Sequence, residues 1–157
     1  MKHPLLAALV ASMAMASAPA VLAADAHDHH HEASPTQLEL NQGRKWPTDA
    51  PLRKAMTALR AEFAGKLPAI HKGSLAPGDY AALGRSVETQ IGAIVSQCKL
   101  EPKADVMLHI VIGELGGAAD VMQGKTAGDP AEAAHHAVMA LNRYGKHFAH
   151  PGWRALK

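Results

Sequence analysis

The sequence predicts an all-α fold: an antiparallel up-down-up-down four-helix bundle, preceded by a signal peptide and a disordered His-rich tail. Hydrophobic residues form 48% of the 157-residue chain but aromatic residues only 4%, and β-branched residues are sparse, which disfavours a β-sandwich or barrel. The apolar residues also recur at helical spacing in four stretches joined by short loops. The length suits one domain, which we place at 46–157, after a signal peptide at 1–23 and a tail at 24–45.

The first 23 residues have the three parts of a secretory signal peptide. Lys2 supplies a positive start, an uncharged apolar core runs from Leu5 to about Ala16, and small residues follow. The core is too short to cross a bilayer, and no later apolar stretch is long enough. We favour cleavage after Ala23, with cleavage after Ala24, or a buried N-terminal helix, as alternatives. We therefore expect a periplasmic protein without stable membrane insertion.

Residues 24–45 are polar, and we expect them to be disordered without a ligand because they offer almost nothing to bury. Four histidines and two acids follow one another there: His27, Asp28, His29, His30, His31 and Glu32. Imidazole is the commonest metal ligand in proteins, so the tract predicts metal binding, with a solvated tail as the alternative. If cleavage follows Ala24, the amino terminus Asp25-Ala26-His27 also offers a square-planar nitrogen set suited to Cu(II) or Ni(II).

The first helix begins at a cap, either Thr48 or Asp49, with Pro51 in its first turn. Its apolar stripe repeats every three or four residues and comprises Leu52, Met56, Leu59, Phe63 and Leu67. Pro68 ends or kinks this helix. The second helix runs from about Pro77 to Cys98, and we expect it to bury Tyr80, Leu83, Val87, Ile91, Ile94, Val95 and Cys98.

The third helix begins at Pro102, and its seam comprises Ala104, Leu108, Val111, Leu115, Ala118 and Met122. Three glycines weaken this helix and permit the close approach of a neighbour: Gly113, Gly116 and Gly117. The fourth helix has Asp129 as its cap, Pro130 in its first turn and Glu132 as a capping-box acid. It stops at Pro151 and buries Ala134, Val138, Leu141, Gly145 and Phe148.

An antiparallel bundle brings the starts of the first and third helices to the same end as the last turns of the second and fourth. That end gathers Trp46, Met56, Cys98, Met107, His109, His147, His150 and Trp153, while the opposite end receives His71, His135 and His136. We name Met56, His147 and His150 as ligands that would join the tail histidines, because sulfur beside imidazole suits Cu(I). The alternatives are core roles for the methionine and Cys98, and solvated positions for His109, His135, His136 and His147.

Six stretches of the chain stand out together: Leu40–Trp46, Asp49–Arg53, Cys98–Pro102, Leu108–His109, Arg143–Phe148 and His150–Trp153. They resemble a group of small exported proteobacterial proteins, some labelled DnrO, that commonly pair a His-rich leader with a helical domain. The resemblance implies a periplasmic helical protein linked to metal, with no established catalytic residue. In outline the bundle also resembles cytochrome b562, which implies Met56 and His147 as haem ligands. Periodicity points His147 away from the core and no Cys-x-x-Cys-His motif is present, so the sequence argues against haem.

Charge and motifs exclude several classes of function. Sixteen Lys+Arg against fourteen Asp+Glu give a net charge of +2, without the basic patch that nucleic-acid binding needs. A single cysteine forms no internal disulfide, and we find no nucleophile with a base, no phosphate-binding loop and no zinc-hydrolase motif, so we expect no enzyme.

We predict a periplasmic protein that sequesters or delivers a transition metal ion, first copper, otherwise nickel, cobalt or zinc. The alternatives are a metal-free stress chaperone or module that binds another periplasmic protein, and a non-covalent haem protein; the oligomeric state stays open.

Overall fold

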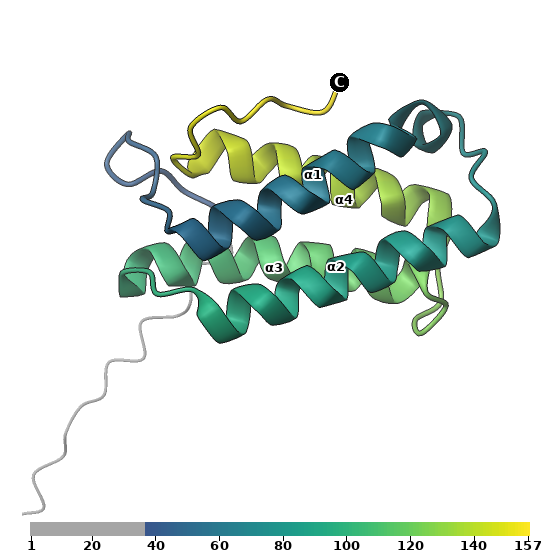
Figure 1. Cartoon of the computed structure of the whole chain (residues 1–157), viewed down its shortest axis with the longest axis horizontal. Helices are drawn as coiled ribbons and strands as arrows, with labels where there is room; N and C mark the ends of the chain where they lie inside the picture. Colours follow the sequence, from purple (N-terminus) through teal and green to yellow (C-terminus); the bar gives the residue numbers. More distant parts are fainter. Residues whose placement is uncertain (1–36) are drawn as a thin grey trace, which may run out of the picture. The chain divides into compact units, whose positions relative to one another are not determined.

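The computed structural model describes residues 37–157, which form four α-helices. They are α1 (Ala50–His71), α2 (Pro77–Gln97), α3 (Pro102–Met122) and α4 (Pro130–His147). Each helix runs back along the one before it, so the chain forms the predicted antiparallel bundle (Figure 1). The predicted signal peptide and the histidines of the tail (His27, His29, His30 and His31) lie outside the described residues.

Of the two caps that the sequence offered for α1, the structure uses Asp49, and Asp129 caps α4 as predicted. An Asp49 carboxylate oxygen accepts a hydrogen bond from the Leu52 N–H at 2.9 Å, and an Asp129 oxygen accepts from the Ala131 N–H at 2.8 Å. These bonds satisfy N–H groups that the first helical turn leaves unpaired. All four helices have proline in the first turn, where its missing N–H costs nothing.

The helix ends differ from the predictions by a few residues. Pro68 lies inside α1, which continues to His71 and closes through a hydrogen bond of 2.9 Å from the Ser74 N–H to the Ala69 carbonyl. Gly73, at φ +59°, provides the left-handed turn that follows. Helix α4 ends at His147, before Pro151, because the backbone then becomes extended and pairs with another segment.

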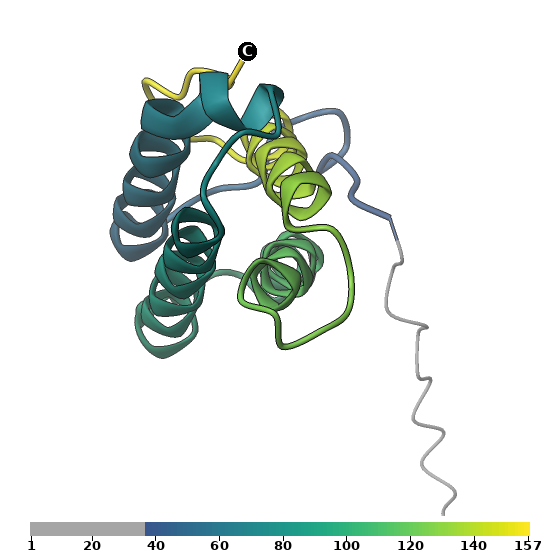
Figure 2. The same ribbon diagram turned by 90° about the vertical axis from the view of Figure 1, so that its right-hand side faces the viewer.

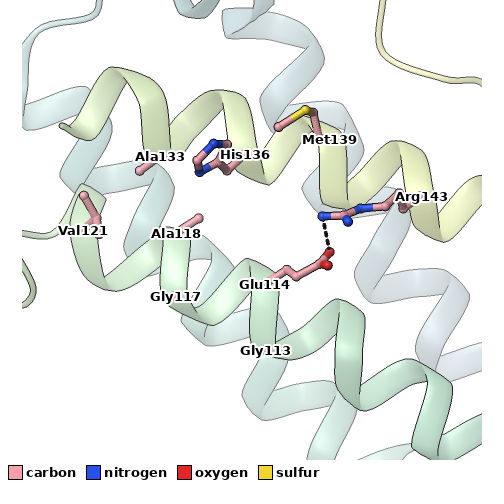
Figure 3. Close-up of a pocket in the computed structure, with 9 residues that line it drawn as sticks. All are labelled: Gly113, Glu114, Gly117, Ala118, Val121, Ala133, His136, Met139 and Arg143. Carbon is pink, nitrogen blue, oxygen red and sulfur yellow. Dashed lines mark ion pairs between the residues drawn. The ribbon is translucent and has the colours of Figure 1, made fainter. Parts of the chain in front are cut away.

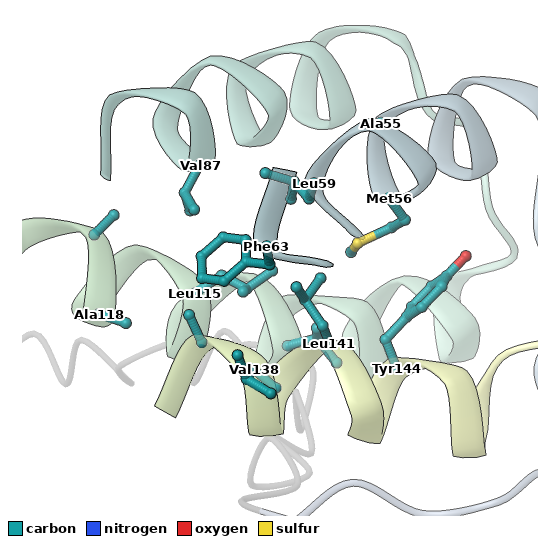
Figure 4. Packing of buried hydrophobic residues seen from close by; sticks show 14 of the residues in the cluster. Ala55, Met56, Leu59, Phe63, Val87, Leu115, Ala118, Val138, Leu141 and Tyr144 are labelled. Atoms are coloured by element: carbon teal, nitrogen blue, oxygen red, sulfur yellow. The ribbon is translucent and has the colours of Figure 1, made fainter. Parts of the chain in front are cut away.

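The core lies between the four helices, which surround it when the bundle is seen end-on (Figure 2). Phe63 from α1, Leu115 from α3 and Leu141 from α4 point into this space (Figure 4), and none of the three is exposed. The predicted stripes of α1, α3 and α4 are buried throughout. These faces were predictable because a 3.6-residue period identifies the buried side of a helix.

The predicted buried face of α2 is wrong near its end. Val95 is 69% exposed, and Ile91 and Cys98 are only half-buried. Ile94, which is 2% exposed, takes the core-facing position in the last turns. Since each residue turns the helix by about 100°, Val95 projects to the side and reaches solvent.

The tail was predicted to be disordered as far as residue 45, but residues 38–46 contact the bundle. The Trp46 indole N–H donates to the Glu39 carbonyl at 2.6 Å, and the Glu39 N–H lies 3.4 Å from the Met107 sulfur on α3. The Trp46 N–H donates to the His147 carbonyl, and the Trp46 carbonyl accepts from the Ala149 N–H, both at 2.8 Å. Burial of Trp46, which is 6% exposed, offsets the entropy of ordering this segment.

The C-terminal residues also pack on the bundle. Asn142 on α4 donates to the Leu156 carbonyl at 2.9 Å and accepts from the Leu156 N–H at 2.8 Å. The leucine side chain is 5% exposed, and the Arg154 carbonyl accepts a hydrogen bond from Arg60 on α1. The last residues therefore form a strap, residues 149–157, across α1 and α4. Within residues 37–157, no helix is both long and apolar enough to cross a membrane.

Candidate functional site

The end of the bundle that was predicted to collect sulfur and imidazole groups holds a polar cluster around His150. The cluster comprises Thr57 from α1, Tyr144 from α4, and His150 and Trp153 from the strap. His150 Nδ1 lies 2.9 Å from the Tyr144 hydroxyl oxygen, and Nε2 lies 3.3 Å from the Thr57 hydroxyl oxygen. The imidazole also packs against Trp153, with ring centroids 5.0 Å apart. Both ring nitrogens of His150 therefore have a hydroxyl as hydrogen-bond partner.

The His150 cluster is uncharged at neutral pH. Burial lowers the pKa of the His150 imidazole, and the nearby Arg53 guanidinium lowers it further. Burial also raises the pKa of the Tyr144 hydroxyl far above its ordinary value. A neutral imidazole has one donor nitrogen and one acceptor nitrogen, so it donates to one hydroxyl and accepts from the other. This arrangement fixes the strap.

Asp49 and Cys98 form a second polar contact at the same end of the bundle. One Asp49 oxygen caps α1, and the other accepts the Lys99 N–H at 2.7 Å. Burial raises the pKa of Asp49, but the backbone hydrogen bonds from Lys99 and Leu52 outweigh it, so the net shift is downward. For Cys98, burial and the Asp49 carboxylate raise the pKa to about 12. The sulfur is therefore a neutral thiol, which is a poor nucleophile.

The three bundle residues predicted as ligands each have other partners. Met56 is fully buried on the core face of α1, and Figure 4 shows its sulfur among apolar side chains. His147 Nδ1 lies 2.8 Å from the Arg143 carbonyl oxygen of its own helix, and His150 is held by two hydroxyls. Among residues 37–157, no group of three or more His, Cys, Asp or Glu side chains is placed to hold a metal ion. A joint site made by these three residues stays a prediction.

Haem does not fit the two residues that the cytochrome b562 outline implies. A haem iron held by Met56 and His147 needs both side chains turned toward one cavity between the helices. Met56 fills the core, while the His147 ring lies along the outside of α4 against the Arg143 carbonyl. Ligation would require His147 to leave this carbonyl and rotate inward.

A groove of about 420 Å³ lies between α3 and α4. Figure 3 shows its lining residues: Gly113, Glu114, Gly117, Ala118, Val121, Ala133, His136, Met139 and Arg143. At one end Arg143 Nη2 forms an ion pair with Glu114 Oε2 at 2.7 Å, and Met139 is 50% exposed. The three glycines were expected to admit a close neighbour. Ile91 Cδ1 of α2 lies 3.8 Å from the Cβ position of Gly116, but nothing lies within 4 Å of the Cβ position of Gly113 or Gly117. Here the missing side chains leave a groove, which periodicity did not reveal.

The remaining histidines lie where the bundle topology predicted. His109 is exposed, and its Nδ1 lies 2.9 Å from the Asp105 carbonyl oxygen of the preceding turn. His71 and His135 stack at the opposite end of the bundle, with ring centroids 5.4 Å apart. Sequence reasoning placed both at that end but did not identify their contact, since nothing in the spacing of residues 71 and 135 reports it.

Among the described residues, Cys98 is a neutral thiol, and His150 lies within hydrogen-bonding distance of two hydroxyls. The described residues offer polar contacts that fasten the terminal segments, an α3–α4 groove and a pair of stacked imidazoles. In comparisons with protein-family models, curated proteins and solved structures, nothing matches this chain. Its function is therefore inferred from its own residues.

Proposed function

We propose that this protein is an exported transition-metal-binding protein whose histidine tract captures the ion. The observation that carries the proposal is the density of donors: four imidazoles within residues 27–31, with Asp28 and Glu32 beside them. Imidazole nitrogens bind copper, nickel, cobalt and zinc, and neighbouring carboxylates attract a cation. Copper heads this list because it has the highest affinity for nitrogen ligands among the divalent ions.

The chemistry of the bundle supports a division of roles between tract and bundle. Cys98 would have to lose a proton of raised pKa before its sulfur could bind an ion, and Met56 is sealed in the core. His150 would have to give up two hydrogen bonds. In this proposal the tract captures the ion, and the bundle is the stable carrier. Sequestration or delivery in the periplasm is the role that we propose.

The test is a titration of the mature chain with Cu(II) and with Zn(II), followed by calorimetry and elemental analysis. The matched variant replaces His27, His29, His30 and His31 by alanine, and the control is His109→Ala, which removes one exposed imidazole from α3. We expect the four-alanine variant to lose the tightest binding and the control to keep it. Equal affinities for the wild type and the four-alanine variant would overturn the proposal.

A second candidate function, binding of a partner protein without metal, is favoured by the α3–α4 groove. Met139 is 50% exposed beside small residues, and unbranched methionine adapts to irregular apolar surfaces. This function predicts that the chain slows aggregation of a thermally unfolding client protein in the presence of a chelator. Met139→Lys should abolish that effect, whereas a lysine at exposed Val95, on α2, should not.

A further inference from the structure

Two imidazoles from different helices meet at the end of the bundle opposite the His150 cluster. His71 is the last residue of α1, and His135 lies in the second turn of α4. Their ring centroids are 5.4 Å apart and the ring planes differ by 15°. Each histidine follows a fully buried residue of its own helix, Ile70 or Ala134, so packing of the core holds both backbones in place.

The ring nitrogens of this pair are available. Neither His71 nor His135 has a hydrogen-bond partner among residues 37–157, whereas His109, His147 and His150 each use at least one ring nitrogen on another protein group. His71 is exposed and His135 is half-buried, so water and ions can reach the pair from the side of His71. Free imidazole lone pairs that face solvent are suitable metal ligands.

We infer that His71 and His135 form a two-imidazole site for a divalent transition-metal ion, with water completing the coordination. Zinc binds imidazole nitrogen at about 2.0–2.1 Å, so two such nitrogens on a tetrahedral ion lie about 3.4 Å apart. Rings whose centroids are 5.4 Å apart reach this separation when they tilt their nitrogens toward a common point. The exposed His71 side chain is free to make this rotation.

A bound ion would connect the last turn of α1 to the first turns of α4. Because the two histidines come from separate helices, the site exists only in the folded chain. An ion that binds the folded state and not the unfolded state raises stability by mass action. The site therefore predicts a metal-dependent rise in the unfolding temperature.

The pair includes none of residues 27–31, so this inference shares only the class of ligand with the proposed function. The test uses the mature full chain with His27, His29, His30 and His31 replaced by alanine, which removes the competing tract. Zn(II) is the probe, because it brings no redox chemistry. Calorimetry measures the stoichiometry, and circular dichroism follows thermal unfolding with and without Zn(II).

We expect this background protein to bind one Zn(II) ion per chain and to unfold at a higher temperature in its presence. His71→Gln and His135→Gln should each remove both effects and leave the metal-free unfolding temperature nearly unchanged. The matched control is His136→Gln, since His136 neighbours His135 but lines the α3–α4 groove, and it should retain both effects. A background protein that binds no Zn(II), or a His71→Gln variant that binds like the background, would overturn the inference. Either result concerns only the four-alanine background, so the comparison of the wild type with the four-alanine variant still tests the proposed function.

Discussion

Gly145 gives the sharpest test of how the strap is seated. The residue lies in the last turn of α4, where alanine would ordinarily stabilise the helix by about 1 kcal/mol. A Cβ atom at this position would lie 3.0 Å from Trp153 Cε2 and closer still to Nε1 and Cδ1 of the same ring. Gly145 therefore lets the indole lie against the helix, beside Tyr144 at a centroid distance of 4.9 Å.

Gly145→Ala should destabilise the protein although it improves helix propensity. The new methyl group must expel the indole, and the lost Trp153–Tyr144 contact is worth about 0.5–1.5 kcal/mol beyond the area it buries. Overpacking a tight contact costs about 1–3 kcal/mol in general. After the gain in propensity of about 1 kcal/mol, the two costs together leave a net loss of about 0.5–3.5 kcal/mol. The Trp153 N–H has no partner among the described residues, so no hydrogen bond adds to the loss.

Equilibrium denaturation, followed by circular dichroism and tryptophan fluorescence, measures this effect. The matched control is Gly92→Ala on α2, where nothing lies within 4 Å of the Cβ position and the free energy of unfolding should rise by up to about 1 kcal/mol. In a Trp153→Ala background, Gly145→Ala should become neutral or stabilising, because the clashing ring is absent. A Gly145→Ala protein as stable as Gly92→Ala would refute the reasoning.

Three further predictions concern the polar contacts. Asp49→Ala removes both the cap of α1 and the tie to Lys99, so the free energy of unfolding measured in urea should fall by about 2–3 kcal/mol, whereas Asp49→Asn should lose less. The folded state lowers the pKa of His150 below the unfolded value of about 6.5. The stabilising contribution of His150 is therefore complete above the unfolded pKa and is lost as the pH falls through the folded pKa. The unfolding temperature of the wild type should drop more between about pH 7 and pH 5 than that of His150→Asn. Asn142→Ala removes the two hydrogen bonds to Leu156, and limited proteolysis should then cut the last residues faster than in Asn142→Asp, which still accepts one of them.

The candidate sites were predictable only in part. The sequence placed Cys98 and His150 at one end of the bundle and His71 and His135 at the other, because alternating helix directions follow from short loops. It did not predict the hydroxyls on His150, the stacking of His71 on His135, or the α3–α4 groove. Each depends on two elements that are far apart along the chain, and nothing in the sequence of either element indicates that they come together.

The sequence by itself determined the number of helices, the cap at Asp129, and the buried stripes of α1, α3 and α4, because each depends on neighbours within about one turn of the same helix. It narrowed the cap of α1 to Thr48 or Asp49, and the structure selects Asp49. Only the tertiary structure decided that Glu39 contacts Met107 of α3, that Val95 faces solvent, and that Trp153 lies on Gly145. Those outcomes depend on how helices cross and where the terminal segments run. Many small packing energies between distant residues set that geometry together, and no local pattern encodes their sum.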